Sequence, residues 1–238
     1  MTRGRVAVFV TCVVDQVFPA VGIAMTEVLQ RLGYAAEFRE RQTCCGQPAF
    51  NTGYWDEARR LARHFLEVFH DAEYIVIPSG SCTSMVAHHF AQLLPNNPAA
   101  QQLASRTWEF SKFLIEVAKV EDVGARFEGP VTYHDSCHAL RELHVHDGPR
   151  RLLARVRGLE LREMDAAAEC CGFGGTFSVK FADVSCAMAR TKIDSILRTK
   201  ADTVVSADSS CLMQLQGAMR RAGLGIRTMH LAEVLASQ

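Results

Sequence analysis

Eight of the nine cysteines of this 238-residue chain form the same pattern twice: a single cysteine, a Cys-Cys-Gly triplet and another single cysteine. The intervals nearly repeat, with 31 and 32 residues before each pair and 36 and 39 residues after it. The eight residues are Cys12, Cys44, Cys45 and Cys82 in the first half, and Cys137, Cys170, Cys171 and Cys211 in the second. Thiolates bind zinc and iron–sulfur clusters, and they carry out thiol–disulfide exchange. The repeated spacing therefore predicts metal or redox chemistry.

Four thiolates in each half match the ligand count of a 4Fe–4S cluster and of a tetrahedral zinc ion. The side chains of adjacent cysteines diverge, so a Cys-Cys pair suits one small ion poorly, whereas a four-iron cluster offers separate iron corners. Gly46 and Gly172 follow the two pairs and allow the backbone to turn closely around a bulky group. We therefore expect a sulfur-rich pocket in each half and one or two 4Fe–4S clusters, with zinc as the alternative.

Three polar residues flank one of these cysteines: His134, Asp135 and His138 lie close to Cys137. They could cap the next helix, or they could form hydrogen bonds around a metal centre that tune its properties. The ninth cysteine, Cys186, lies outside the pattern in a segment with helical periodicity, and we expect it to pack in the core. No residue is assigned a catalytic role.

Strands and helices alternate along the chain in the same order in both halves. Apolar β-branched runs predict strands at 6–10, 36–39, 74–78, 131–133, 159–164, 203–206 and 226–229. Helical periodicity predicts helices at 20–32, 55–69, 84–94, 107–120, 149–156, 178–197, 212–222 and 231–235. A linker is expected at 123–130, between domains at residues 1–122 and 123–238.

This alternation predicts an α/β fold of two pseudo-symmetric βαβ, Rossmann-like halves with parallel sheets. The four single cysteines directly follow predicted strands, and the two Cys-Cys-Gly loops follow strands as well. Ligands of such sheets bind at the carboxyl ends of the strands. All eight thiols should therefore lie on the same edge of their sheets, where residues distant in the sequence meet.

The composition excludes several classes of partner. The chain has 26 basic and 26 acidic residues, so no net charge attracts nucleic acid or an anionic membrane surface. No apolar run approaches the roughly 20 residues of a membrane-spanning helix. We read the apolar run after the basic start as a first strand rather than a signal peptide, which predicts a cytoplasmic protein. In that reducing compartment patterned cysteines are metal ligands or catalysts rather than structural disulfides.

The paired cysteine blocks resemble the CCG cysteine-rich domain that is found in heterodisulfide reductase and in the iron–sulfur subunits of glycolate and glycerol-3-phosphate oxidases. Segments 78–82, 133–138 and 170–177 are most similar to the lactate-utilisation protein A family. The resemblance covers nearly the whole chain. It implies an electron-transfer component of a cytoplasmic iron–sulfur complex that oxidises L-lactate to pyruvate, with other iron–sulfur subunits as partners.

The chain departs from the broader CCG pattern in one respect. That pattern commonly ends in Cys-x-x-Cys, but here Met85 and Gln214 stand where a fifth thiol would follow Cys82 and Cys211. An ordinary four-thiolate cluster per half fits this count better than an unusual noncubane cluster. Two other functions remain open: a thiol–disulfide oxidoreductase or redox sensor that uses vicinal cysteines, and a zinc-stabilised assembly module.

Overall fold

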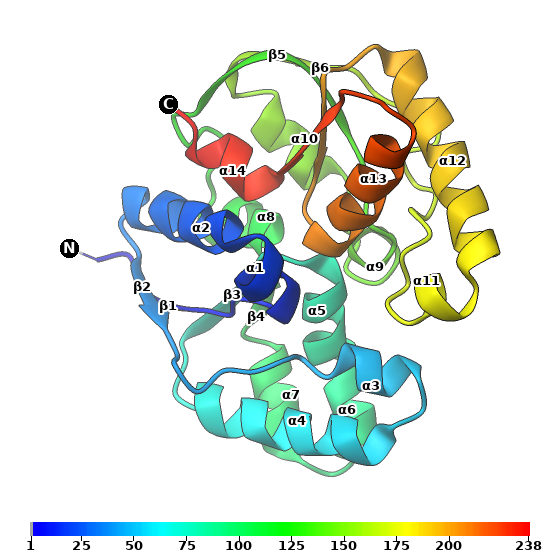
Figure 1. Ribbon diagram of the computed structural model, residues 1–238. Coiled ribbons are helices and arrows are strands. Elements are labelled where there is room, and N and C mark those ends of the chain that lie inside the picture. Colours follow the sequence, from blue (N-terminus) through cyan, green and yellow to red (C-terminus); the bar gives the residue numbers. More distant parts are fainter. Residues whose placement is uncertain (1) are drawn as a thin grey trace.

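Two four-stranded parallel sheets, one in each half of the chain, form the centre of the molecule (Figure 1). The structure is a computed structural model that describes residues 2–238. The strand order is β2-β1-β3-β4 in the first sheet and β6-β5-β7-β8 in the second, so the two halves share one topology. The strands are β1 (Arg5–Val8), β2 (Ala35–Phe38), β3 (Tyr74–Ile77), β4 (Thr107–Glu109), β5 (Arg126–Tyr133), β6 (Arg157–Leu161), β7 (Thr203–Ser206) and β8 (Arg227–His230). The predicted α/β fold of two similar halves is confirmed.

Helices connect the strands of each sheet. In the first half they are α1 (Cys12–Val17), α2 (Pro19–Arg31), α3 (Gln47–Asn51), α4 (Trp55–Phe69), α5 (Gly80–Ser84), a π-helical segment (Met85–His89), α6 (Phe90–Leu93), α7 (Pro98–Ala104), α8 (Phe110–Lys112) and a second π-helical segment (Phe113–Val117). In the second half they are α9 (Cys137–Arg141), α10 (Asp147–Leu153), α11 (Phe177–Lys180), α12 (Ala182–Thr199), α13 (Ser209–Arg221) and α14 (Leu231–Ala236).

Two predicted elements, 55–69 and 203–206, have the bounds of α4 and β7. Helix α4 buries an apolar stripe, and every residue of β7 is buried, as expected of a central strand in a parallel sheet. The helical pattern of α4 is long and the run of β7 is apolar, so both elements can be predicted from the sequence without tertiary information.

Three expectations are wrong in detail. The helix expected at 107–120 begins with strand β4, because Thr107–Glu109 pairs with β3 at the sheet edge. Residues 126–130 of the expected linker belong to β5, whose pairing with β6 and β7 outweighs its glycine and proline. The helix expected at 178–197 is interrupted at Phe181, where the backbone leaves the helical region at φ −127° and ψ 52°.

The two halves pack against each other through their helices. The C-terminal helix α14 lies along α2 of the first half, and buried side chains of both halves form one apolar cluster (Figure 1). Arg31 on α2 donates hydrogen bonds to the carbonyl oxygens of Val123 (3.1 Å), Leu235 (3.2 Å) and Ala236 (2.8 Å). The relative placement of the halves is therefore set by packing as well as by the connecting chain.

A second junction joins the halves at the carboxyl ends of their strands. The buried carboxylate of Asp208 accepts hydrogen bonds from the Ser79 hydroxyl (3.1 Å) and from the Ser81 amide (3.0 Å). Ser79 caps α5 and Asp208 caps α13, so the two contacting residues occupy equivalent positions in the repeat. The halves thus meet at the strand edge that the cysteines follow.

His230, which also lies at this junction, is expected to make folding stability depend on pH. It is buried; its Nδ1 accepts from the Ala232 amide (3.0 Å), and its Nε2 lies 3.1 Å from the Pro78 carbonyl oxygen. Burial lowers its pKa from 6.5 to about 4, because the protein interior solvates a charged imidazolium less well than water does. Between these values the unfolded chain binds the extra proton, so stability falls as pH falls.

We expect His230→Asn, which can still cap α14, to reduce this pH dependence by about 1.4 kcal/mol per pH unit between pH 6.5 and 4. Urea unfolding of both proteins across this range measures the two slopes. Identical slopes would show that His230 does not titrate as its burial demands.

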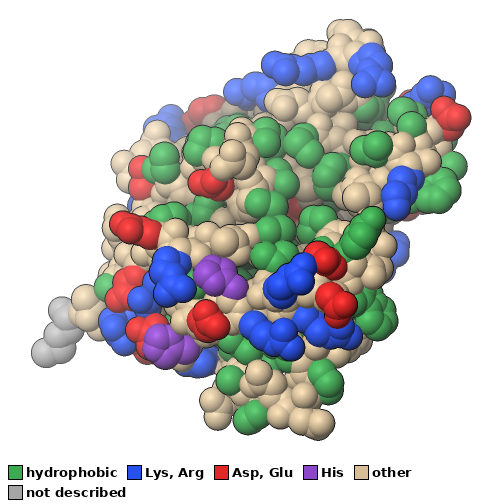
Figure 2. All heavy atoms as spheres, turned by 60° about the horizontal axis from the view of Figure 1, so that its bottom comes forward, with side chains coloured by type: hydrophobic (Ala, Val, Ile, Leu, Met, Phe, Trp, Pro, Cys, Tyr) green, Lys and Arg blue, Asp and Glu red, His purple; other side chains and the backbone are tan. Residues whose placement is uncertain are grey.

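The surface carries charges of both signs. Figure 2 shows Lys, Arg, Asp and Glu side chains interspersed over one face rather than gathered into a patch of one sign. Among the helices of residues 2–238, none combines the length and the apolar character needed to cross a membrane.

Candidate metal centre

All eight patterned cysteines line one cavity, which lies where the two halves meet. We call it the sulfur cavity and define it by Cys12, Cys44, Cys45, Cys82, Cys137, Cys170, Cys171 and Cys211. The two sets of thiols, expected in separate pockets, open into this one cavity, because the carboxyl edges of the two sheets face each other across the junction. Residues from opposite ends of the chain therefore share one cavity.

The strand order explains where the single cysteines lie. In each sheet the chain leaves two neighbouring strands in opposite directions, and ligands bind at such a switch point. Cys12 is the first residue of α1, directly beyond β1, and Cys82 lies in α5, directly beyond β3. Cys137 and Cys211 occupy the equivalent positions beyond β5 and β7. The predicted location of these four residues at strand ends is confirmed.

The two Cys-Cys-Gly loops have the same backbone geometry. Gly46 has φ +87° and Gly172 has φ +86°, values that only glycine adopts readily. Their amides point back at the first cysteine of each pair: Gly46 N lies 3.4 Å from Cys44 Sγ, and Gly172 N lies 3.3 Å from Cys170 Sγ. These N–H groups stabilise a sulfur anion in both loops.

In each half the first thiol of the Cys-Cys pair is more acidic than the single cysteine that precedes the pair. Hydrogen bonds from Cys12 and Cys45, together with the Gly46 amide, lower the pKa of Cys44 to about 3. The equivalent hydrogen bonds lower the pKa of Cys170 to about 2. Hydrogen bonding to Cys44 and burial raise the pKa of Cys12. Each half thus offers one preformed thiolate, and metal binding would release protons from the other thiols.

The donor set fits a metal group. The Cys12 and Cys44 sulfurs lie 3.7 Å apart, close to the edge of about 3.8 Å that a tetrahedral ion with Zn–S bonds of about 2.3 Å requires. The cavity has a volume of about 120 Å³. A single water needs only about 10–15 Å³, so there is room for a group much larger than one ion. Zinc and an iron–sulfur cluster are therefore both compatible with these residues.

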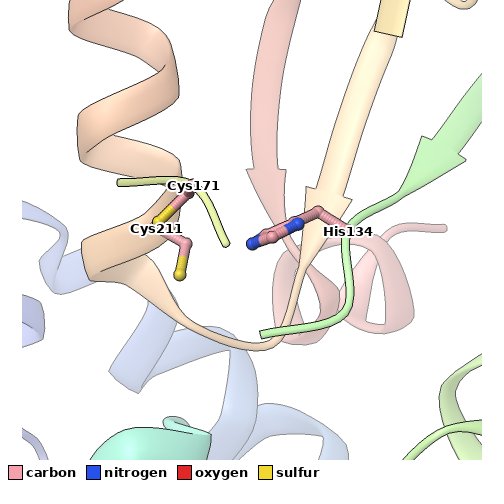
Figure 3. Close-up of side chains that lie close together, drawn as sticks. All are labelled: His134, Cys171 and Cys211. Atoms are coloured by element: carbon pink, nitrogen blue, oxygen red, sulfur yellow. The ribbon is translucent and has the colours of Figure 1, made fainter. Parts of the chain in front are cut away.

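The three polar residues that flank Cys137 have different surroundings. His138 lines the sulfur cavity, with Nδ1 3.5 Å from Cys137 Sγ. Asp135 turns away and forms a two-point ion pair with Arg150, at 2.8 and 3.0 Å. The buried ring of His134 points at Cys171 and Cys211, and one ligand atom from each of these residues lies within 4.8 Å of the others (Figure 3).

Cys186 lies outside the sulfur cavity. It is on α12 and lines a groove between α12 and α13, where it is partly exposed. The expectation of core packing is wrong, because this face of α12 is only partly covered by α13. The sulfur cavity also includes polar residues that the sequence did not single out, among them Gln47, Ser79, Ser136 and Asp208. The sequence did offer one signal for Asp208, since it lies three residues before Cys211.

Comparison with known proteins agrees with this arrangement. The family model of the cysteine-rich CCG domain matches residues 6–87 and 131–216. Lactate utilization protein A of Bacillus cytotoxicus is 46% identical over 238 residues, covering 98% of this chain and 99% of that protein. The protein of the same name from Bacillus thuringiensis (strain Al Hakam) is 47% identical with the same coverage. The crystal structure of a hypothetical protein from Helicobacter pylori has a TM-score of 0.69, with 10% identity over 99% of this chain and 49% of that one, which shows a shared fold.

Proposed function

The chain belongs to the lactate utilization protein A family, and we propose that it is an iron–sulfur electron-transfer subunit of a cytoplasmic complex that oxidises L-lactate to pyruvate. One observation carries the proposal: the eight thiols of the repeated pattern, which span 200 residues of sequence, line a single cavity. Such convergence is what thiolate-bound inorganic cofactors require and what buried structural cysteines do not need.

The residues of the chain would hold and tune the cofactor. The eight cysteines are the proposed ligands, and Cys44 and Cys170 are already favoured as thiolates. The amides of Gly46 and Gly172 donate to sulfur, which is one of the ways in which proteins set the reduction potential of a cluster. When bound, iron–sulfur clusters accept and release single electrons.

Oxidation of L-lactate to pyruvate releases two electrons and two protons, so the complex needs a substrate site and an electron acceptor. We assign the substrate site to a partner subunit, since Ser79, Ser136 and Asp208 of the sulfur cavity are already engaged in capping helices. Other iron–sulfur subunits of the same complex are the proposed donor and acceptor of electrons.

A zinc-stabilised assembly module is the second candidate. The 3.7 Å distance between the sulfurs of Cys12 and Cys44 favours it, because that spacing suits one tetrahedral ion better than thiolates on separate irons. The cavity volume favours the cluster instead.

Metal and sulfide analysis of anaerobically purified protein distinguishes these functions. We expect iron and acid-labile sulfide in equal amounts, about four of each per occupied half, with a brown colour. Stoichiometric zinc without sulfide would support the assembly module and contradict electron transfer. Metal-free protein whose thiol titre changes in pairs on oxidation would instead indicate thiol–disulfide exchange.

A further inference from the structure

His134 is an unusual residue for its position. It follows β5 directly, is 0% exposed, and neither ring nitrogen has a hydrogen-bond partner among residues 2–238. Leaving a buried polar group unpaired costs about 1–3 kcal/mol, so native proteins rarely do it. The imidazole therefore needs a partner that the polypeptide does not supply.

The internal repeat shows that the fold itself does not require a histidine here. His134 lies three residues before Cys137, and Phe9 lies three residues before Cys12. Both backbone amides make the equivalent hydrogen bond, from Phe9 to Val76 O (3.0 Å) and from His134 to Val205 O (2.8 Å).

The side chain of Phe9 makes apolar packing contacts. Its ring packs edge-on against Phe65, with centroids 4.9 Å apart, and against Phe69 at 5.8 Å. An apolar ring thus satisfies this position of the fold in the first half. In the second half the equivalent ring is that of His134, which carries two nitrogens. The reason for a histidine at this position must therefore lie in what those nitrogens bind.

The surroundings of His134 identify the partner. One nitrogen of its ring and the sulfurs of Cys171 and Cys211 all lie within 4.8 Å of one another, and the ring is aimed at the two thiols (Figure 3). All three residues are buried. A neutral imidazole beside two thiols is a mixed nitrogen–sulfur donor set of the kind that binds zinc or the iron of a cluster.

We propose that His134 is a direct nitrogen ligand of the metal group in the second half, together with Cys171 and Cys211. This inference rests on the proposed function in one respect: it takes the metal group of the second half to be an iron–sulfur cluster. With Cys137 and Cys170 the second half then offers five possible donors, one more than the four that a tetrahedral ion or a four-iron cluster takes, so the imidazole takes the place of one thiolate. The first half, with Phe9 at this position, remains an all-thiolate site.

The two halves then differ in charge. A neutral imidazole that takes the place of a thiolate removes one negative charge from the centre, and histidine ligation raises the potential of a cluster. This change of ligand raises the reduction potential of the second-half centre relative to the same cluster held by thiolates alone.

The test uses anaerobic protein labelled with ¹⁵N-histidine, in three forms: wild type, His134→Phe and His138→Phe. His134→Phe copies the residue of the first half, and His138→Phe is the matched control from the same cavity. Pulsed EPR of the reduced protein detects histidine nitrogen bound to iron. We expect the nitrogen coupling in wild type and His138→Phe and its loss in His134→Phe. In parallel, metal-free protein is titrated with Co²⁺, and affinity should fall roughly 10–100-fold or more in His134→Phe alone.

The outcomes separate this inference from the proposed function. Wild-type protein with full iron and sulfide but no coupled histidine nitrogen overturns the ligand assignment and leaves the electron-transfer role standing. Protein that binds Co²⁺ through a histidine lost in His134→Phe, but never acquires iron and sulfide, supports the ligand and removes the electron-transfer role. If His134→Phe does not fold, a histidine nitrogen coupling that persists in His138→Phe still supports the assignment, and its loss in that variant overturns it.

Discussion

Replacement of Cys45 by serine is expected to abolish the first-half metal centre. Cys45 is 2% exposed and lines the sulfur cavity together with Cys44 and Cys82. A serine hydroxyl stays protonated and is a poor ligand for iron, so the remaining three thiolates hold a cluster incompletely. We expect anaerobic Cys45→Ser protein to lose about half of the iron and sulfide of wild type where both halves are occupied.

Cys186→Ser is the matched control for this experiment, because it makes the same chemical change outside the sulfur cavity. Its iron and sulfide content should equal that of wild type. Equal iron content in the Cys45→Ser and Cys186→Ser proteins would contradict the assignment of Cys45 as a ligand.

Substitution of Gly80 by alanine is expected to destabilise the junction between the halves. Gly80 begins α5, which packs against α9 of the other half. A Cβ atom at Gly80 would lie 2.5 Å from Ala139 Cβ and 2.9 Å from Ser136 Oγ, closer than van der Waals contact allows. The two helices must therefore move apart, and Cys82, two residues further along α5, moves with them.

We expect Gly80→Ala to lower the free energy of unfolding by about 1–3 kcal/mol. For a chain of this size each kcal/mol corresponds to about 2–4 °C in the melting temperature. The iron content should fall as well, since the two sets of thiols share one cavity. Thermal unfolding and iron analysis of the same preparation measure both effects.

Gly217→Ala is the control for the backbone effect of adding a methyl group. Gly217 lies within helix α13, and apart from the helix's own backbone no atom of residues 2–238 lies within 4 Å of its Cβ position, so alanine should leave the protein unchanged or stabilise it by up to about 1 kcal/mol. A Gly80→Ala protein as stable as Gly217→Ala would show that the contact between α5 and α9 does not limit the approach of the halves.

Much of the fold follows from local patterns in the sequence. The repeat of strands and helices predicts two similar α/β halves because each element carries its own periodicity, as in α4 and β7. The same reasoning places Cys12, Cys82, Cys137 and Cys211 at the carboxyl ends of strands, since in parallel sheets these ends share one edge. The internal repeat also contains the contrast between Phe9 and His134, which an alignment of the two halves exposes without coordinates.

Other features depend on how distant segments meet. Strand β4 forms because β3 offers it an edge, and Phe181 interrupts a helix whose local pattern is continuous. Most importantly, the docking of α14 on α2 and the contact between Asp208 and Ser79 turn the two cysteine-bearing edges toward each other.

The amino-acid sequence by itself determined the two sets of four thiols and the strand ends that carry them, because spacing and periodicity are local properties of the chain. Only the tertiary structure decided that both sets open into one cavity and that the ring of His134 faces Cys171 and Cys211. The physical reason is that the orientation of one half against the other is set by contacts between residues far apart in the chain, such as those of Arg31 with Leu235 and Ala236. Such contacts leave no periodic signal in either partner.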